Sequence, residues 1–218
     1  MKRAKTEILI IRHGETAWNT VRRLQGYTDI PLNAHGRRQA KALAAQLQAE
    51  KLDAIIASDL QRAVQTAGEI ARLQGLPTRI DKDLRERCFG GFEGKLYSEL
   101  PEIYPVEYAH WRLRDPDFRF PASTEDPQYI GESLSEFHQR AMRALIHYAT
   151  QFQDKKIAIV THGGVLECAY REAKNLPLDA EREVKLHNAG INRFVFEAGR
   201  LSLVSYGEIA HLEIAQAA

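Results

Sequence analysis

Three short aliphatic runs, each followed by a helical pattern, constrain the fold of this chain more than any other feature. The runs lie in residues 7–11, 53–58 and 156–164, and each is rich in residues that favour strands. Unbroken apolar runs of this length are typical of parallel strands that are covered on both faces. The alternation of strands and helices therefore predicts an α/β fold, with helices on both faces of a largely parallel sheet.

Helical spacing of apolar residues predicts four helices. The patterns lie in residues 32–52, 58–77, 131–152 and 164–177. Asn33 is placed to cap the first helix, and Ser58 or Asp59 is placed to cap the second. Ser133 and Glu136 have the spacing of a capping box at the start of the third.

The remaining segments complete the expected organisation. Residues 192–207 predict a hairpin of two strands. Residues 101–131 hold five of the eight prolines and few periodic positions, so we expect an irregular, lid-like insertion at about 95–131. No internal repeat or linker divides the sequence, and its 218 residues suffice for one substantial core. We therefore expect residues 1–218 to form a single domain.

Charge and composition argue against several classes of function. The formal net charge is +1, so no overall field would hold the chain to nucleic acid or to an anionic membrane. The apolar run before Arg12 is too short for a signal peptide, and no other run approaches the ~18 residues of a membrane span. Cys88 and Cys168 lie far apart and have no CxxC partner. We expect a cytoplasmic protein with no nucleic-acid or membrane partner.

Basic side chains follow all three predicted strands. Arg12 and His13 follow the first, Arg62 lies one turn into the helix after the second, and His162 and Gly163 follow the third. Because sites in open α/β sheets form at the carboxyl ends of the strands, we expect these residues to converge. Guanidinium and imidazole groups around one point suit a compact oxyanion, and the start of a helix adds amide donors. The pattern indicates a phosphate site.

The same residues predict phosphoryl transfer without a metal. The sequence has no HExxH motif, no carboxylate cluster at ligand spacing and no Cys pair, and two arginines near His13 would repel a divalent cation. It also lacks a Walker A motif, so nucleotide hydrolysis of that kind is unsupported. An unprotonated His13 could attack phosphorus and form a phosphohistidine. Glu86 could protonate the leaving alkoxide and later deprotonate an attacking water.

Six motifs, in order along the chain, resemble the signatures of the histidine phosphatase superfamily, also called the phosphoglycerate mutase-like family. They are RHGETAWN (12–19), LQGYTDIPLNAHGRRQA (24–40), SDLQRAVQTA (58–67), LRERCFGGFEG (84–94), GESL (131–134) and VTHGGVLE (160–167). The resemblance implies a three-layer α/β/α sandwich with a largely parallel central sheet. It also implies a metal-independent, two-step phosphohistidine mechanism.

The resemblance implies a role for each matching residue. His13 resembles the phosphorylated nucleophile and Glu86 the proton donor. Arg12, Arg62 and His162 resemble the other members of the catalytic phosphate pocket. The remaining positions that match phosphate-binding residues of the family are Asn19, Gln25, Gly26 and Gly163. The implied substrate is a small phosphomonoester, and no cofactor or metal is expected.

Two departures from the mutases of this family favour its phosphatase branch. The mutases resemble one another in reading HGN after the second histidine, where this chain reads HGG at 162–164. They also carry a longer segment after the acid, followed by paired arginines that hold the substrate carboxylate, whereas here Glu86 is followed by RCFGGFEG (87–94). The stretch NAGIN (188–192) is similar to the late strand of the phosphatase branch. We therefore expect a phosphomonoester hydrolase that acts on a small phosphorylated metabolite.

Two alternatives stay open. Arg112 and Arg114 could clamp a substrate carboxylate, as in a phosphoglycerate mutase that needs 2,3-bisphosphoglycerate as its primer, or they could be surface charges. The other alternative is a protein of this fold that binds a ligand without turnover. Such a protein would be expected to lack the nucleophile or a pocket arginine, whereas all five core positions are present here.

Overall fold

The computed structural model describes residues 4–123 and 130–214. Its strands are β1 (Lys5–Arg12), β2 (Ala54–Ala57), β3 (Thr78–Ile80), β4 (Lys156–Thr161), β5 (Ile191–Glu197) and β6 (Arg200–Glu208). Its helices are α1 (Ala17–Thr20), α2 (Ala34–Gln46), α3 (Gln61–Gln74), α4 (Leu100–Ile103), α5 (Pro105–Arg112), α6 (Leu134–Gln151), α7 (Gly163–Lys174) and α8 (Ala210–Ile214). Short 3-10 turns are η1 (Lys82–Leu84) and η2 (Gly90–Phe92).

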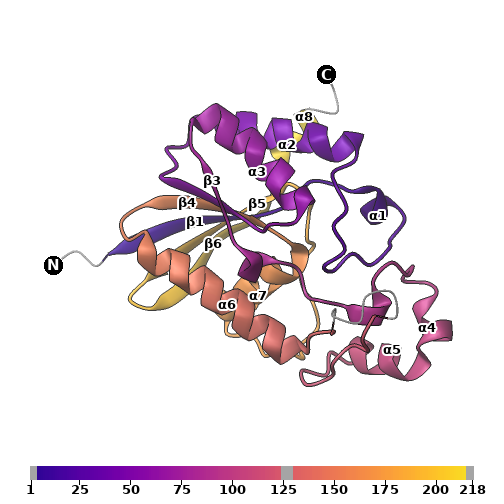
Figure 1. The fold of residues 1–218 in the computed structure, drawn as a ribbon. Helices are drawn as coiled ribbons and strands as arrows, with labels where there is room; N and C mark the ends of the chain where they lie inside the picture. The colour runs from indigo at the N-terminus through magenta and orange to yellow at the C-terminus, as the bar shows by residue number, and fades with distance from the viewer. Residues whose placement is uncertain (1–3, 124–129, 215–218) are drawn as a thin grey trace.

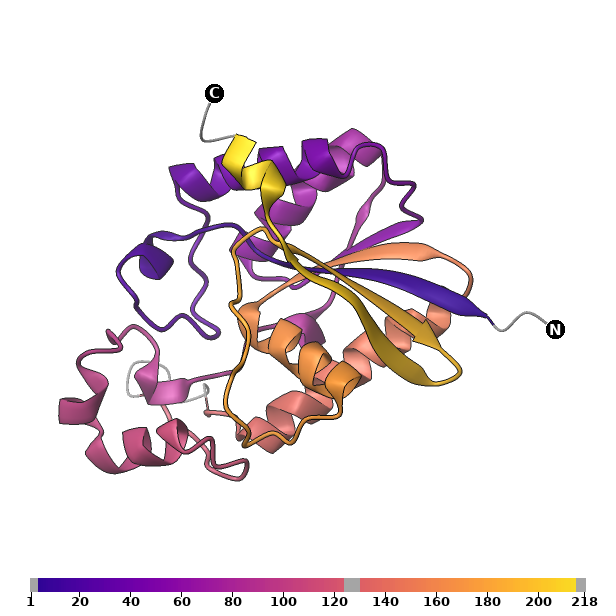
Figure 2. The ribbon, with the colours of Figure 1, turned by 180° about the vertical axis from the view of Figure 1, so that it is seen from behind.

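A six-stranded sheet lies between two layers of helices (Figure 1). The strand order is β3-β2-β4-β1-β5-β6, in which the first four strands are parallel and β5 and β6 continue the sheet in antiparallel pairs. Helices α2, α3 and α8 cover one face, and α6 and α7 cover the other (Figures 1 and 2). This arrangement confirms the predicted α/β fold with a largely parallel sheet between helical layers.

The central strand β1 shows why both faces are covered. Ile8 and Ile10 belong to the core cluster formed with α6 and α7, whereas Leu9 and Ile11 belong to the cluster formed with α2 and α3. All four side chains are at most 2% exposed. Burying an aliphatic side chain of this size contributes about 1.5–3 kcal/mol, so this strand is stable only between two helical layers.

The predicted capping residues are confirmed in two helices and wrong in the third. The side chain of Asn33 caps α2, and Ser133 with Glu136 forms the predicted capping box of α6. Helix α3 instead begins after Leu60, with no side-chain capping bond. The expected caps are engaged elsewhere: Asp59 accepts two hydrogen bonds from Arg85, and Ser58 contacts a histidine described below.

The strands β5 and β6 form the predicted hairpin, whereas β3 was missed. The hairpin turns at Ala198 and Gly199, both of which have positive φ angles. The strand β3 has only three residues and lies at the edge of the sheet. A strand this short carries too little periodicity to be recognised in a sequence.

The segment expected to be irregular contains two helices, so that prediction was wrong for the part that the structure describes. Residues 124–129 of the expected insertion lie outside the described residues. Pro101 is the second residue of α4 and Pro105 the first residue of α5, and proline is favoured in the first turn of a helix. Phe92, Leu100 and Phe120 form a small aromatic-rich core beneath these helices. We call residues 95–123 the cap segment.

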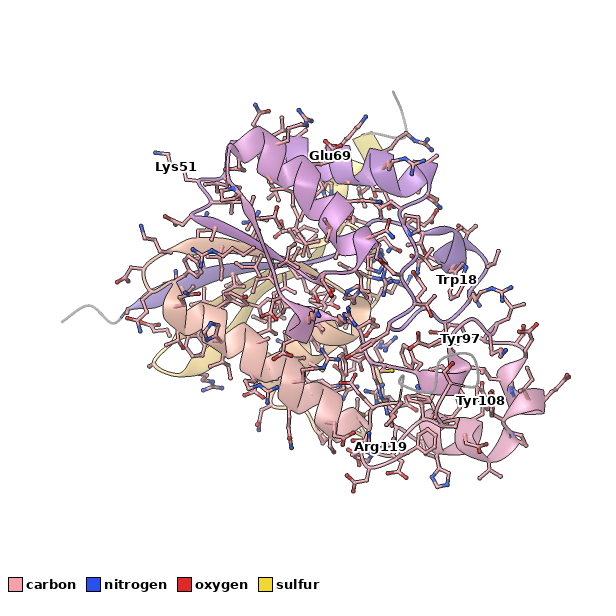
Figure 3. The ribbon with its side chains drawn as sticks, viewed as in Figure 1. Trp18, Lys51, Glu69, Tyr97, Tyr108 and Arg119 are labelled. Atoms are coloured by element: carbon pink, nitrogen blue, oxygen red, sulfur yellow. The ribbon has the colours of Figure 1, made fainter. Side chains whose placement is uncertain are left out.

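The cap segment is joined to the loop that follows α1. The amide of Tyr97 donates to the carbonyl of Arg22 at 3.1 Å, and Arg23 and Leu96 form an isolated antiparallel bridge. Trp18 and Tyr97 lie on the same flank of the molecule (Figure 3). The cap segment therefore borders the carboxyl ends of the parallel strands. Within residues 4–123 and 130–214, no helix is long and apolar enough to cross a membrane.

Two backbone segments cross in close contact directly after His13. A Cβ atom added to Gly14 would lie 2.6 Å from the carbonyl oxygen of Gly36. A Cβ atom added to Gly36 would overlap the carbonyl of Glu15 and lie 2.7 Å from its amide nitrogen. The start of α2 is therefore held against the loop that follows β1.

We expect Gly36→Ala to lower the free energy of unfolding by about 1–3 kcal/mol, because the added methyl group meets backbone that cannot move aside. Gly68→Ala is the matched control, since Gly68 is also helical and has nothing within 4 Å of an added Cβ. That control should be stabilising by about 0.5–1 kcal/mol, because alanine favours helices. Urea denaturation measures both values. Equal stability of the two variants would contradict the close approach.

Candidate active site

Strand register brings the predicted site residues together. Arg12 of β1 is aligned with Thr161 of β4, so His13 and His162 follow as neighbours. The amide of His13 donates to the carbonyl of Thr161 at 2.9 Å, and the centroids of the two imidazole rings are 5.2 Å apart. Arg62 reaches the same point from α3, as predicted. Its Nε lies 3.3 Å from Nδ1 of His162.

His13 is buried as a neutral imidazole with one free nitrogen. Its Nδ1 lies 2.7 Å from the carbonyl oxygen of Gly14, which can only accept, so Nδ1 carries the proton. Nε2 therefore presents a lone pair. Burial, followed by the charges of Arg62 and Arg12, lowers the pKa of His13 well below 6.5. His13 is thus neutral and nucleophilic at neutral pH.

His162 is held from both ring nitrogens. Arg62 donates to Nδ1, so the neutral ring carries its proton on Nε2, which lies 2.8 Å from the hydroxyl oxygen of Ser58. Burial, followed by the charge of Arg62, lowers the pKa of His162 well below 6.5. Ser58 orients this ring, a role that the sequence analysis missed. The signal for this role in the sequence was the position of Ser58 at the end of a predicted strand.

Arg62 is a fully buried cation that is held by two backbone carbonyls and by His162. It is 1% exposed and donates to Gly26 at 2.7 Å and to Thr28 at 2.9 Å. Burial lowers the pKa of Arg62 to about 10, so it stays charged at neutral pH. Its contacts with these carbonyls and His162 use three of the five N–H groups of a guanidinium, which leaves two for an anion. The contact places Gly26, predicted to bind phosphate, as a support of Arg62.

Glu93 holds the loop that carries Gly26, and the sequence analysis did not identify it. Its carboxylate accepts from the amides of Tyr27 (3.0 Å), Thr28 (2.8 Å) and Phe89 (2.9 Å). Gly26 has φ +52°, and a Cβ atom there would overlap the Glu93 side chain. Glycine is therefore required where this loop turns beside Arg62. The FEG stretch of the fourth motif, which contains Glu93, was the signal in the sequence.

One nitrogen of the Arg12 guanidinium is anchored to a backbone carbonyl, and a second nitrogen keeps a free N–H donor. Its Nη1 donates to the carbonyl of Leu186, whereas its buried Nε has no hydrogen-bond partner among the described residues. Burial lowers the pKa of Arg12 from its usual value, against the opposing charge of Glu86. A Cβ atom added to Gly163 would lie 3.5 Å from this Nε. Gly163, at the start of α7, is therefore beside Arg12 as expected.

Asn19 and Gln25 lie in one polar network beside His13. Oδ1 of Asn19 accepts from the amide of Thr16 at 3.1 Å, and Oε1 of Gln25 accepts from the hydroxyl of Thr16 at 3.0 Å. Both amide nitrogens are left for other acceptors. Asn188, which was not predicted as a site residue, donates to the carbonyl of His13 at 2.9 Å and contacts Asn19 at 3.4 Å.

The side-chain carboxylate of Glu86 lies against the first turn of α7. Its Oε2 accepts from the amide of Gly164 at 3.0 Å, and its Oε1 accepts from the amide of Arg87 at 2.9 Å. A Cβ atom at position 164 would overlap this carboxylate and lie 2.9 Å from ring carbons of Phe137. The glycine of the HGG motif therefore makes room for Glu86 at the helix end.

The two cap arginines, Arg112 and Arg114, differ in their surroundings. Arg112 is exposed at the end of α5. Arg114 donates to the carbonyl of Leu178 at 3.1 Å and lies 2.7 Å from the carboxylate of Glu167. Arg114 thus ties the cap segment to the connection between α7 and β5. In the described ranges, no group of three or more His, Cys, Asp or Glu side chains is placed to hold a metal ion.

Comparisons with known proteins agree with this geometry. The model of the histidine phosphatase superfamily (branch 1) matches residues 8–209. Over 210 residues the chain is 36% identical to phosphoglycerate mutase-like protein 4 of Arabidopsis thaliana, which covers 95% of this chain and 87% of that protein. Over 209 residues it is 34% identical to the metal-independent phosphoserine phosphatase of the same plant, which covers 95% and 83%.

A solved structure extends this similarity to three dimensions. The structure of Entamoeba histolytica phosphoserine phosphatase in complex with 3-phosphoglyceric acid matches with a TM-score of 0.82. The sequence identity is 29%, and the match covers 95% of this chain and 99% of that chain.

Proposed function

Because this chain belongs to the histidine phosphatase superfamily, we propose that it is a metal-independent phosphomonoester hydrolase that works through phosphorylated His13. The observation that carries the proposal is the state of His13: a buried, neutral imidazole whose Nε2 is free, beside two arginines with unused donors. The relative named a metal-independent phosphoserine phosphatase supports the absence of a metal from the reaction.

The first step transfers the phosphoryl group to His13. Nε2 attacks phosphorus, the bond from phosphorus to the ester oxygen breaks, and protonated Glu86 gives its proton to the leaving alkoxide. Arg12 and Arg62 neutralise the phosphoryl oxygens, with Asn19, Gln25 and the amide of Gly163 as further donors. The imidazolium formed on His13 keeps its Nδ1 proton, which the Gly14 carbonyl accepts.

The second step returns the enzyme to its starting state. Ionised Glu86 takes a proton from water as the oxygen attacks phosphorus, and the bond from phosphorus to Nε2 breaks. Inorganic phosphate leaves, and His13 is again neutral with Glu86 protonated. His162, oriented by Arg62 and Ser58, contributes the remaining wall of the pocket.

Hydrolysis is favoured over mutase activity by two observations. Gly164 allows Glu86 to rest on the start of α7, whereas the resemblance drawn from the sequence implies asparagine at that position in the cofactor-dependent mutases. Arg114 is bound to Glu167 and to the carbonyl of Leu178, which argues against a role in holding a mutase substrate. Phosphoglycerate mutase is the second candidate, because several relatives carry phosphoglycerate mutase in their names.

The proposed substrate is a small phosphorylated metabolite. The solved relative that contains 3-phosphoglyceric acid supports this size and charge class. The proposed location is the cytoplasm, because Cys88 and Cys168 are both buried free thiols, the form that a reducing compartment maintains.

We expect the purified protein, treated with EDTA, to release phosphate from members of a phosphomonoester panel. The same preparation should not interconvert 3- and 2-phosphoglycerate when it is primed with 2,3-bisphosphoglycerate. The panel should contain sugar phosphates, phosphoserine, phosphoglycerates, α-ribazole phosphate and nucleotides. Rapid primed interconversion with little phosphate release would favour the mutase over the hydrolase. Activity that EDTA abolishes would contradict the metal-free mechanism.

A further inference from the structure

A buried carboxylate beside the candidate active site is surrounded by more positive charge than it can balance. Glu167 of α7 lies 2.7 Å from Arg114, 2.9 Å from Arg171 and 2.8 Å from Nε of Arg182. Its side chain is 8% exposed. Three guanidinium groups share this one carboxylate, so the cluster keeps a surplus of positive charge.

Arg182 is the member of this cluster that faces solvent. The side chain of Arg182 is 48% exposed, against 19% for Arg114 and 3% for Arg171. Arg171 and Arg114 also donate to backbone carbonyls, Arg171 to Pro177 and Ala180 and Arg114 to Leu178. Arg182 binds Glu167 through Nε and Nη2, and in the described structure its Nη1 makes no hydrogen bond. The surplus charge is therefore available at Arg182.

The contacts along α7 and the connection after it indicate that Arg182 lies near Glu86. Glu167 lies three residues after Gly164 on α7, which is the spacing of neighbours on one helix face, and Gly164 binds the Glu86 carboxylate. Arg182 also precedes by four residues Leu186, whose carbonyl binds Arg12. This connection between α7 and β5 runs along the side of the molecule that faces the cap segment (Figure 2).

Electrostatics agrees with this placement. Burial lowers the pKa of Arg182, but the charges of Glu167 and Glu86 outweigh that effect and raise it above its usual value. Arg182 and Glu86 are therefore close enough to influence each other. Because the proposed function has Glu86 protonate the leaving oxygen, this placement puts Arg182 on the side of the pocket that would receive the alcohol part of a substrate.

We propose that Arg182 binds a carboxylate on the alcohol part of the substrate, so that the preferred substrates are phosphomonoesters of small hydroxy acids. This inference rests on the proposed function. A guanidinium is suited to a carboxylate because its planar donors match the two oxygens. Glu167 orients Arg182 from behind, and the other two arginines offset the charge of Glu167, so Arg182 keeps its attraction for a second anion.

The test compares two substrates that differ only in the carboxylate, O-phosphoserine and O-phosphoethanolamine. The readout is the ratio of their kcat/KM values in wild type, Arg182→Gln and Arg182→Lys. Arg182→Gln should lower the ratio by about tenfold or more, mainly through KM for phosphoserine, because a charged hydrogen bond is lost. Arg182→Lys should restore part of it. The pair 3-phosphoglycerate and glycerol 3-phosphate repeats the comparison on another hydroxy acid.

Arg72→Gln is the matched control. Arg72 is an exposed arginine on α3 that also pairs with a glutamate, Glu69, at 3.0 Å, and it lies outside the site. This control should leave the ratio unchanged. A wild-type enzyme with no preference for the carboxylate, or an Arg182→Gln variant that loses activity equally on both substrates, overturns the assignment and leaves the hydrolase intact. Absence of phosphate release from every ester tested would instead reject the hydrolase itself.

Discussion

Replacing His13 with asparagine should lower kcat for phosphate release by more than about a thousandfold, because the variant lacks the ring nitrogen that is proposed to accept the phosphoryl group. The fold should persist. The ring of His13 makes one hydrogen bond, to the carbonyl of Gly14, and an asparagine amide can also donate there. The measurement combines steady-state phosphate release with a chemical trap: wild type incubated with labelled substrate should yield a protein-bound phosphate that is stable to base and labile to acid.

The control for this variant is His147→Asn, which changes an exposed histidine near the end of α6, outside the candidate active site at the carboxyl ends of the strands. It should retain both turnover and the labelled intermediate. Labelled protein in the His13→Asn variant would show that another residue is phosphorylated. Turnover close to wild type would remove His13 from the mechanism, provided that circular dichroism shows both variants folded.

The convergence of the four basic core residues was predictable because it depends on strand direction. Arg12, His13 and His162 follow parallel strands, and Arg62 lies in the first turn of the helix after a third. The carboxyl ends of parallel neighbours meet at one edge of a sheet whatever the details of packing. The arrangement of strands thus places the residues, and side-chain packing decides only how they are oriented.

Contacts that depend on orientation could not be predicted in this way. Ser58 had the features of a helix cap, but its hydroxyl contacts His162, and α3 begins later than expected as a result. Glu167 and Arg182 are separated by a connection without periodicity, so nothing in the sequence indicates their contact. The prolines of the cap segment were misread as loop signals because proline at a helix start and proline in a loop look alike in a sequence.

Replacing Glu86 with glutamine should lower the rate of phosphate release from an alkyl phosphomonoester by about 10²–10⁴-fold, the usual contribution of a general acid and base. Glutamine keeps the size of the side chain and an oxygen that can accept from the amide of Gly164 or Arg87, but it carries no proton to give. An activated aryl phosphate behaves differently, because its phenolate leaves without a proton. His13 should then be phosphorylated rapidly, and the slow attack of water should follow.

Rapid mixing separates these two steps. With the aryl phosphate, the Glu86→Gln variant should release a burst of phenolate equal to the enzyme concentration, and with the alkyl ester it should show no burst. Gly164→Ala tests the same carboxylate without changing it, because the added methyl group would displace Glu86 from the start of α7. This variant should lose alkyl ester hydrolysis more than aryl phosphorylation. If Glu86→Gln slows the aryl burst as much as alkyl turnover, Glu86 acts on the phosphoryl group itself and not on the leaving oxygen.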